Sequence, residues 1–132
     1  MLLRMKSLLM SLLLSISLVT GSNAEIPVLT EKDAGREVIL KNGAEFMIQL
    51  PANPTTGYSW SVMVSPLDLL VQEKPSRYVA SDHAGHLVGA GGSECWQFRF
   101  VKPGCAKLSF AYARPWEKGM PPMRVVEFSV RR

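Results

Sequence analysis

The stretch Ser93–Val101, SECWQFRFV, alternates between aromatic residues and mainly polar ones. This two-residue period is that of a β-strand with one buried face and one solvated face. Its aromatic face holds Trp96, Phe98 and Phe100. The run Ala106–Ala113 repeats the pattern, with one face made of Ala106, Leu108, Phe110 and Tyr112. Two-faced strands of this kind are typical of antiparallel sheets.

Short runs rich in β-branched and aromatic residues continue on both sides of this stretch, and Gly and Pro separate them. No long 3.6-residue period is present. The predicted strands are Arg36–Leu40, Glu45–Leu50, Tyr58–Ser65, Leu69–Ala80 with a break near Lys74-Pro75, Ser93–Val101, Ala106–Ala113 and Met123–Arg131. About seven strands in roughly 100 residues predict an all-β fold, an immunoglobulin-like antiparallel β-sandwich.

Residues 1–24 have the three parts of a secretory signal peptide. Two basic residues precede the apolar run Leu8–Val19, and Ser22 and Ala24 give a small-x-small ending. The apolar run is too short for an ordinary transmembrane helix. We therefore expect residues 1–24 to be removed and residues 25–132 to form one domain, exported to the periplasm or the extracellular space without a membrane anchor.

The charge of the mature domain excludes one class of partner. Removal of Arg4 and Lys6 lowers the formal net charge from +4 to +2. A domain so weakly basic lacks the electrostatic footprint of a nucleic-acid-binding protein. No nucleic-acid partner is expected.

The loops are placed by the direction of the strands, because successive antiparallel strands are connected alternately at the two ends of a sandwich. Short connections at 41–43, 66–68 and 102–104 would share one end. Longer connections at 51–57, 81–92 and 114–122, here called the first, second and third loops, would share the other end. Binding residues concentrate on loops that a rigid scaffold holds, so this second end is the candidate site.

The first loop leads through Asn53-Pro54-Thr55-Thr56-Gly57 into Tyr58. Pro54 fixes its own φ and favours an extended Asn53, and Gly57 can adopt the positive φ that reverses the chain. Between them, Thr55 and Thr56 form a small, stiff tip. This tip suits insertion into a cleft, and the same residues also fit an ordinary tight hairpin turn.

The other two loops also carry features of binding segments. Gly89-Ala90-Gly91-Gly92 leaves backbone groups open to an approaching chain, although a long flexible loop is the alternative. A phosphate cradle is disfavoured because Glu94 stands where the third glycine of G-x-G-x-x-G belongs. The third loop begins Arg114-Pro115-Trp116, and Trp and Arg dominate interface hot spots, although the indole could also pack over its own sheet.

Together these motifs resemble the chagasin family, inhibitors of papain-like (cathepsin-like) cysteine peptidases, over essentially all of residues 25–132. The family motifs N-P-T-T-G-[YF], G-x-G-G and R-P-W correspond to Asn53–Tyr58, Gly89–Gly92 and Arg114–Trp116. The resemblance implies an immunoglobulin-like sandwich whose three loops enter the peptidase cleft. It also implies an inhibitor rather than an enzyme, which acts without a cofactor and without covalent chemistry. We expect a monomer.

The resemblance also implies roles for individual residues. Thr55 and Thr56 would lie over the catalytic Cys and His of the peptidase, Gly89–Gly92 along the non-primed side, and Arg114–Trp116 on the primed side. The expected peptidase-binding residues are Asn53, Pro54, Thr55, Thr56, Gly57, Tyr58, Val88, Gly89, Ala90, Gly91, Gly92, Arg114, Pro115 and Trp116.

Other functions remain as alternatives. Asp82, His83 and His86 could offer three metal ligands, although no metal site is expected. Catalysis is disfavoured, because no G-x-S-x-G elbow is present and Cys95 lies on a strand away from the loops. A non-catalytic adhesion or carbohydrate-binding sandwich, with Trp116 and Tyr58 as stacking surfaces, is the main alternative.

Cys95 and Cys105 invite pairing in an exported chain. However, the extended residues between Cys95 and the position facing Cys105 span on the order of 20 Å. A disulfide needs Cα atoms within about 7 Å. We therefore predict two free thiols, with Cys95 on the face opposite the aromatic residues. The family pattern does not require this pair.

Overall fold

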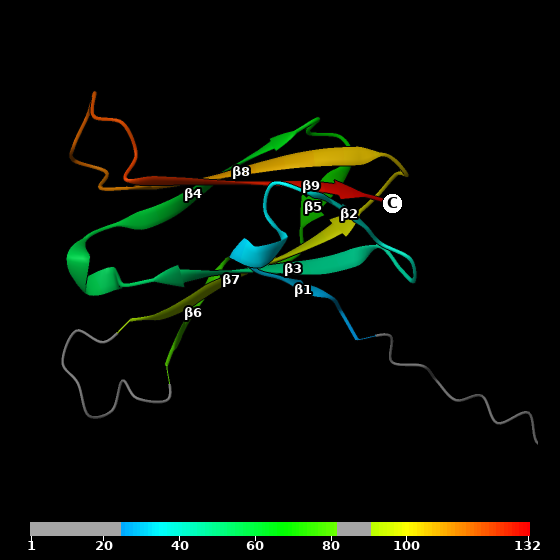
Figure 1. Ribbon diagram of the computed structural model, residues 1–132, viewed down its shortest axis with the longest axis horizontal. Helices are drawn as coiled ribbons and strands as arrows, with labels where there is room; N and C mark the ends of the chain where they lie inside the picture. Colours follow the sequence, from blue (N-terminus) through cyan, green and yellow to red (C-terminus); the bar gives the residue numbers. More distant parts are fainter. Residues whose placement is uncertain (1–24, 82–90) are drawn as a thin grey trace, which may run out of the picture.

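The computed structural model describes residues 25–81 and 91–132. Two β-sheets pack face to face, and Figure 1 shows them as two layers, with β4, β8 and β9 in one and β1, β3, β6 and β7 in the other. The strands are β1 (Val28–Leu29), β2 (Glu37–Ile39), β3 (Glu45–Ala52), β4 (Ser59–Ser65), β5 (Leu70–Gln72), β6 (Arg77–Ala80), β7 (Gly92–Phe100), β8 (Cys105–Ala113) and β9 (Arg124–Arg131). Two short 3-10 helices are η1 (Glu31–Asp33) and η2 (Pro54–Thr56).

The two sheets have different strand orders. The first runs β1-β3-β7-β5, and β6 also pairs with β7. The second runs β2-β9-β8-β4. Ile48 of β3 lies opposite Trp96 of β7, and Trp60 of β4 lies opposite Tyr112 of β8. These central antiparallel ladders confirm the immunoglobulin-like sandwich that the alternating pattern predicts.

The core lies between the sheets and is built by the alternation itself. Five phenylalanines are almost completely buried, namely Phe46, Phe98, Phe100, Phe110 and Phe128. Trp96 and Phe110 pack in a T-shaped arrangement with ring centroids 4.8 Å apart, and this contact joins the two sheets. No charged or polar residue is buried among the described residues, so apolar contact holds this interior together.

Two features of the sheets differ from the prediction. The described residues form nine strands rather than about seven, because β1 was not expected and the run Leu69–Ala80 is divided into β5 and β6. The division falls at the predicted break, where Pro75 cannot donate a ladder hydrogen bond. The sheets are also not wholly antiparallel, since β1 pairs parallel to β3 and β2 parallel to β9. The chain crosses between the sheets around η1, and a pattern of buried faces carries no information on strand direction.

The short connections meet at one end of the sandwich, on the right in Figure 1. The Lys102 ammonium lies 3.5 Å from the Asp68 carboxylate, which joins two of these connections. The Leu40 N–H donates to the Arg131 carbonyl at 2.8 Å. No helix within residues 25–81 or 91–132 has the length and apolar character that crossing a membrane requires.

Candidate functional site

The first loop folds into η2, a single turn that its flanking residues hold in place. The Asn53 side-chain oxygen accepts the Thr55 N–H at 3.2 Å, and the Gly57 N–H donates to the Pro54 carbonyl at 3.1 Å. Gly57 adopts φ of +80°, the left-handed conformation that glycine tolerates best. The positive φ that the sequence predicts at this position is confirmed.

The tip of the first loop faces solvent but is ordered by its own hydroxyls. Thr55 Oγ1 donates to Asn53 Oδ1 at 2.6 Å, and Thr56 Oγ1 donates to the Asn53 carbonyl at 2.7 Å. Pro54, Thr55 and Thr56 are all exposed. The loop therefore presents a small polar tip whose shape is set before any partner arrives.

The third loop begins with a tight turn. The Glu117 N–H donates to the Arg114 carbonyl at 3.1 Å, and Pro115 stands at the second position, where its fixed φ favours such a turn. The turn leaves Trp116 65% exposed. The indole therefore does not belong to the core, and its packing partner lies in the first loop.

The first and third loops touch directly. A Cβ atom built on Gly57 would lie 2.2 Å from Cη2 of Trp116, so the indole occupies the space that the glycine leaves. Arg114 Nε donates to the Thr56 carbonyl at 3.1 Å, and the guanidinium carbon lies 4.4 Å from the centroid of the Tyr58 ring. Two of the three predicted loops thus form one surface, on the left in Figure 1.

An aromatic column supports this surface from below, and the sequence pattern alone did not reveal its role. Tyr58 stacks on Tyr112 at 5.2 Å, and Tyr112 stacks on Trp60 at 4.6 Å between ring centroids. The Asn53 N–H donates to the Tyr112 hydroxyl at 3.0 Å, and Trp60 Nε1 donates to the Pro51 carbonyl at 2.9 Å. A signal was present in the sequence, because Tyr112 is the polar member of a predicted buried face, at the end nearest the loops.

The second loop is described only at its two ends. Val88, Gly89 and Ala90, and the alternative metal ligands Asp82, His83 and His86, lie outside the described residues. Gly92 pairs with Ala52 on one side and with Ala80 on the other. A Cβ atom on Gly91 would lie 3.0 Å from the Ala52 carbonyl oxygen, so this end of the loop runs beside the start of the first loop.

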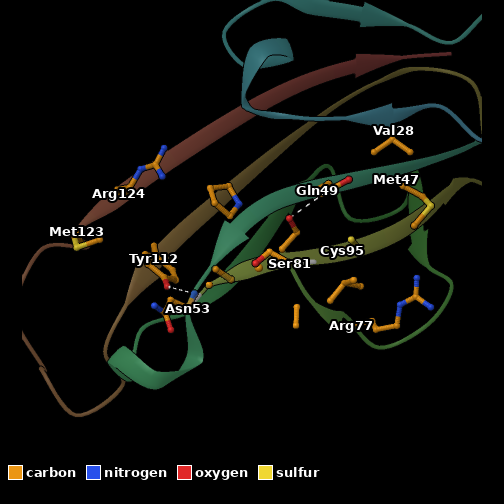
Figure 2. Close-up of a pocket in the computed structure, with 17 residues that line it drawn as sticks. Val28, Met47, Gln49, Asn53, Arg77, Ser81, Cys95, Tyr112, Met123 and Arg124 are labelled. Atoms are coloured by element: carbon orange, nitrogen blue, oxygen red, sulfur yellow. Dashed lines mark hydrogen bonds between the residues drawn. The ribbon is translucent and has the colours of Figure 1, made fainter. Parts of the chain in front are cut away.

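A broad groove of about 870 Å³ lies beside the site, on the outer face of the first sheet (Figure 2). Its lining includes Met47, Gln49, Arg77 and Cys95, and Asn53 lies where the groove approaches the loops. Burial raises the pKa of the Cys95 thiol, Arg77 lowers it and Glu94 raises it further. The net increase disfavours the thiolate that nucleophilic chemistry would need. Among the described residues, no group of three His, Cys, Asp or Glu side chains could hold a metal ion.

Both cysteines are free thiols, in agreement with the predicted register. Cys95 faces Gln49 and Arg77 in the first sheet, whereas Cys105 faces Arg131 in the second. Cys95 is partly exposed on the outer face, as the alternation predicts.

Comparison with known proteins identifies the family. The family model described as Chagasin family peptidase inhibitor I42 matches residues 39–130. The chain is 33% identical to Amoebiasin-2 of Entamoeba histolytica over 113 residues, which are 86% of this chain and 90% of that protein. It is 30% identical to Chagasin of Trypanosoma cruzi over 92 residues, which are 67% of this chain and 81% of that protein.

A solved structure agrees with the family model and with the sequence relatives. The crystal structure of a cysteine protease inhibitor from Entamoeba histolytica superposes with a TM-score of 0.71 at 32% identity, and the match covers 80% of this chain and 94% of that one. The family match includes the first loop, the glycines at the end of the second and the turn of the third. The chain therefore belongs to the chagasin family of peptidase inhibitors and is an inhibitor rather than an enzyme.

Proposed function

We propose that this protein is a reversible, tight-binding inhibitor of papain-like cysteine peptidases, which it blocks by placing its three loops in the active-site cleft. Membership of a peptidase-inhibitor family supports inhibition. The cysteine class is supported by the related inhibitor from Entamoeba histolytica, which the chain resembles in both sequence and structure. No cofactor and no covalent bond to the peptidase are required.

The contact between the first and third loops is the observation that carries this proposal. Trp116 is exposed yet packs against Gly57, and the threonine tip is exposed yet hydrogen-bonded to Asn53. Binding by loops that are already ordered avoids most of the entropy cost that a flexible peptide bears. An interface of about 1,600 Å² can then reach very tight affinity, as protease–inhibitor complexes do.

The conformation of the tip also explains how an inhibitor could escape cleavage. Thr55 and Thr56 lie within the 3-10 turn η2, so the backbone between them is helical rather than extended. A peptidase attacks a peptide bond that reaches its nucleophile in a defined geometry. A turn held by Asn53 and Gly57 would cover the catalytic Cys and His while offering no such bond.

Export forms a second part of the proposal. Residues 1–24 have the composition of a signal peptide, and cleavage after Ala24 would release the domain to the periplasm or the extracellular space. There it would meet peptidases outside the cytoplasm. A monomer suffices for this function, because one chain carries all three loops.

The main alternative is a non-catalytic adhesion or carbohydrate-binding sandwich, with Tyr58 and Trp116 as stacking surfaces. In the structure the Tyr58 ring already stacks on Tyr112 and carries the Arg114 guanidinium. Little of that ring is left for a sugar, so the geometry favours the inhibitor.

Titration of active papain with the purified mature domain tests the proposal. We expect activity to fall linearly to near zero at a one-to-one ratio and to return on dilution over time. A chymotrypsin-like serine protease, assayed in parallel, should be unaffected. Undiminished papain activity across a panel of papain-like peptidases would contradict the proposed function.

A further inference from the structure

Arg114 is one of the expected peptidase-binding residues, and its side chain already makes several contacts within the chain. Its Nε donates to the Thr56 carbonyl, and its Nη1 donates to Glu117 Oε1 at 3.2 Å. Its guanidinium carbon lies 4.4 Å from the Tyr58 ring centroid and 5.9 Å from that of Trp116. One side chain thus contacts two loops that are far apart in sequence.

Glu117 completes this arrangement and matches none of the family motifs. It closes the Arg114–Glu117 turn through its backbone N–H, and its carboxylate pairs with the same guanidinium. The side chains of Arg114 and Glu117 are each about one third exposed, so the electrostatic energy of the ion pair is modest. Its structural effect is larger, because it fixes the direction in which the planar guanidinium points.

We propose that Arg114 and Glu117 are positioning residues that join the first and third loops into one rigid unit before a peptidase is bound. The inference rests on the proposed function and adds to it. The unit is anchored to the core, since the Tyr58 ring under the guanidinium stacks on Tyr112. Its outer face is formed by Trp116 and the threonine tip.

Because the two loops form one unit, a mutation in one loop should also change the order of the other loop. If the loops were independent, a change in the third loop would leave the first loop unaffected in the free protein. In a joined unit, loss of the Glu117 carboxylate frees Arg114, and the hydrogen bond from Arg114 to Thr56 weakens. The amides of Thr55, Thr56 and Gly57, which are hydrogen-bonded within the first loop, should then exchange faster.

Hydrogen exchange of the free mature domain, measured beside papain inhibition, tests the inference. The variants are Arg114→Lys, which keeps the charge but loses the planar fork, Glu117→Ala, and Glu117→Gln, whose amide oxygen can still accept from Arg114. Glu37→Ala is the matched control, because it breaks an exposed ion pair with Arg131 away from the loops. Melting temperatures of all four show whether the fold is retained.

We expect Arg114→Lys and Glu117→Ala each to accelerate amide exchange in residues 53–58. Each should also raise the inhibition constant about 5- to 30-fold, which lies within the coupling found between residues of one network. A fifth variant that combines Arg114→Lys with Glu117→Ala should inhibit papain little worse than either single variant, because both changes break the same contact. The exchange rates and the inhibition constant of Glu117→Gln should lie between those of Glu117→Ala and the wild type. Glu37→Ala should change neither the exchange rates nor the inhibition constant.

Two results would overturn the inference. Weakened inhibition with unchanged exchange in residues 53–58 would mean that these side chains contact the peptidase directly. Faster exchange in residues 53–58 with an unchanged inhibition constant would mean that inhibition does not require the two loops to be joined. Failure of the proposed function is seen separately, because the wild-type domain itself would then not inhibit papain.

Discussion

The indole of Trp116 packs so closely against Gly57 that a Cβ atom at residue 57 would lie 2.2 Å from the ring carbon Cη2. Gly57 also has φ of +80°, so its lack of a side chain meets two needs in one place. It lets the first loop reverse direction, and it leaves room for a side chain of the third loop. The shape of the candidate site therefore depends on this contact.

Gly57→Ala should abolish most inhibition, because the methyl group must displace the indole. Gly35→Ala is the matched control, since Gly35 has φ of +77° and a Cβ atom placed there would have no neighbour within 4 Å. Both variants should lose about 1–2 kcal/mol of stability from the left-handed backbone. Only Gly57→Ala should raise the inhibition constant by more than about tenfold, a change of ~1.4 kcal/mol. Equal inhibition by the two variants would show that the indole does not need its place on Gly57.

Trp116→Ala should weaken peptidase binding by roughly 2–4 kcal/mol, the range for hot-spot truncation, because a large exposed ring is lost from the binding surface. The melting temperature should change little, since the side chain is 65% exposed. Leu67→Ala, which removes an 82% exposed side chain at the opposite end, should affect neither quantity. Inhibition constants and thermal melts measure both effects. A large fall in the melting temperature with Trp116→Ala would place the indole in the core instead.

The Cys95 thiol should react slowly with iodoacetamide near neutral pH. Burial raises its pKa, so a smaller fraction is thiolate at any given pH than in an unfolded chain. The alkylation rate, followed by peptide mapping, should keep rising beyond the pH at which the same peptide in denatured protein levels off. Mapping without reductant should find no link between Cys95 and Cys105. A plateau at lower pH than in the denatured chain would show an activated thiol.

Asp33→Asn should destabilise the protein at pH 7 by about 0.5–1 kcal/mol, through loss of a charged cap of η1. The Thr30 N–H, which donates to Asp33 Oδ2 at 2.9 Å, and the Arg36 side chain lower the pKa of this carboxyl. A lowered folded-state pKa contributes stability above the unfolded value of about 3.9, and this contribution is lost as pH falls through the folded value. Urea unfolding of the wild type and of Asp33→Asn should therefore give free energies of unfolding that differ at pH 7 and differ less below pH 3. If the difference between the two proteins were the same at both pH values, the charge of Asp33 would not contribute to stability.

Secretion of the full chain should yield a mature protein that starts at Glu25. Ala24→Leu should block processing, because the residue before the cut must be small, whereas Asn23→Leu at the tolerant position between the small residues should not. Intact-mass spectrometry of periplasm and medium measures both results. A cytoplasmic protein that retains residues 1–24 would contradict the predicted export.

Much of the fold follows from local pattern. The alternation around Trp96, Phe98 and Phe100 assigns one face of β7 to the core, and that face is buried. The Pro-Gly spacing of the first loop predicts the positive φ of Gly57. These features depend on neighbours in the chain, so they can be deduced from the sequence. The family motifs are equally local, and their residues alone indicate the end of the sandwich that is proposed to bind the peptidase.

Contacts between distant segments could not be deduced in the same way. The parallel pairing of β1 with β3 and of β2 with β9 depends on where the N-terminal segment crosses between the sheets. The second role of Arg114 depends on Thr56 and Tyr58 lying within its reach, and the support from Tyr112 depends on the Trp60 and Tyr58 rings stacking on it. Residue types and spacing specify faces and turns, because each arises from a few adjacent dihedral angles. Only the folded sandwich decides which side chains of separate loops come into contact, because the distance between them is set by how the two sheets pack.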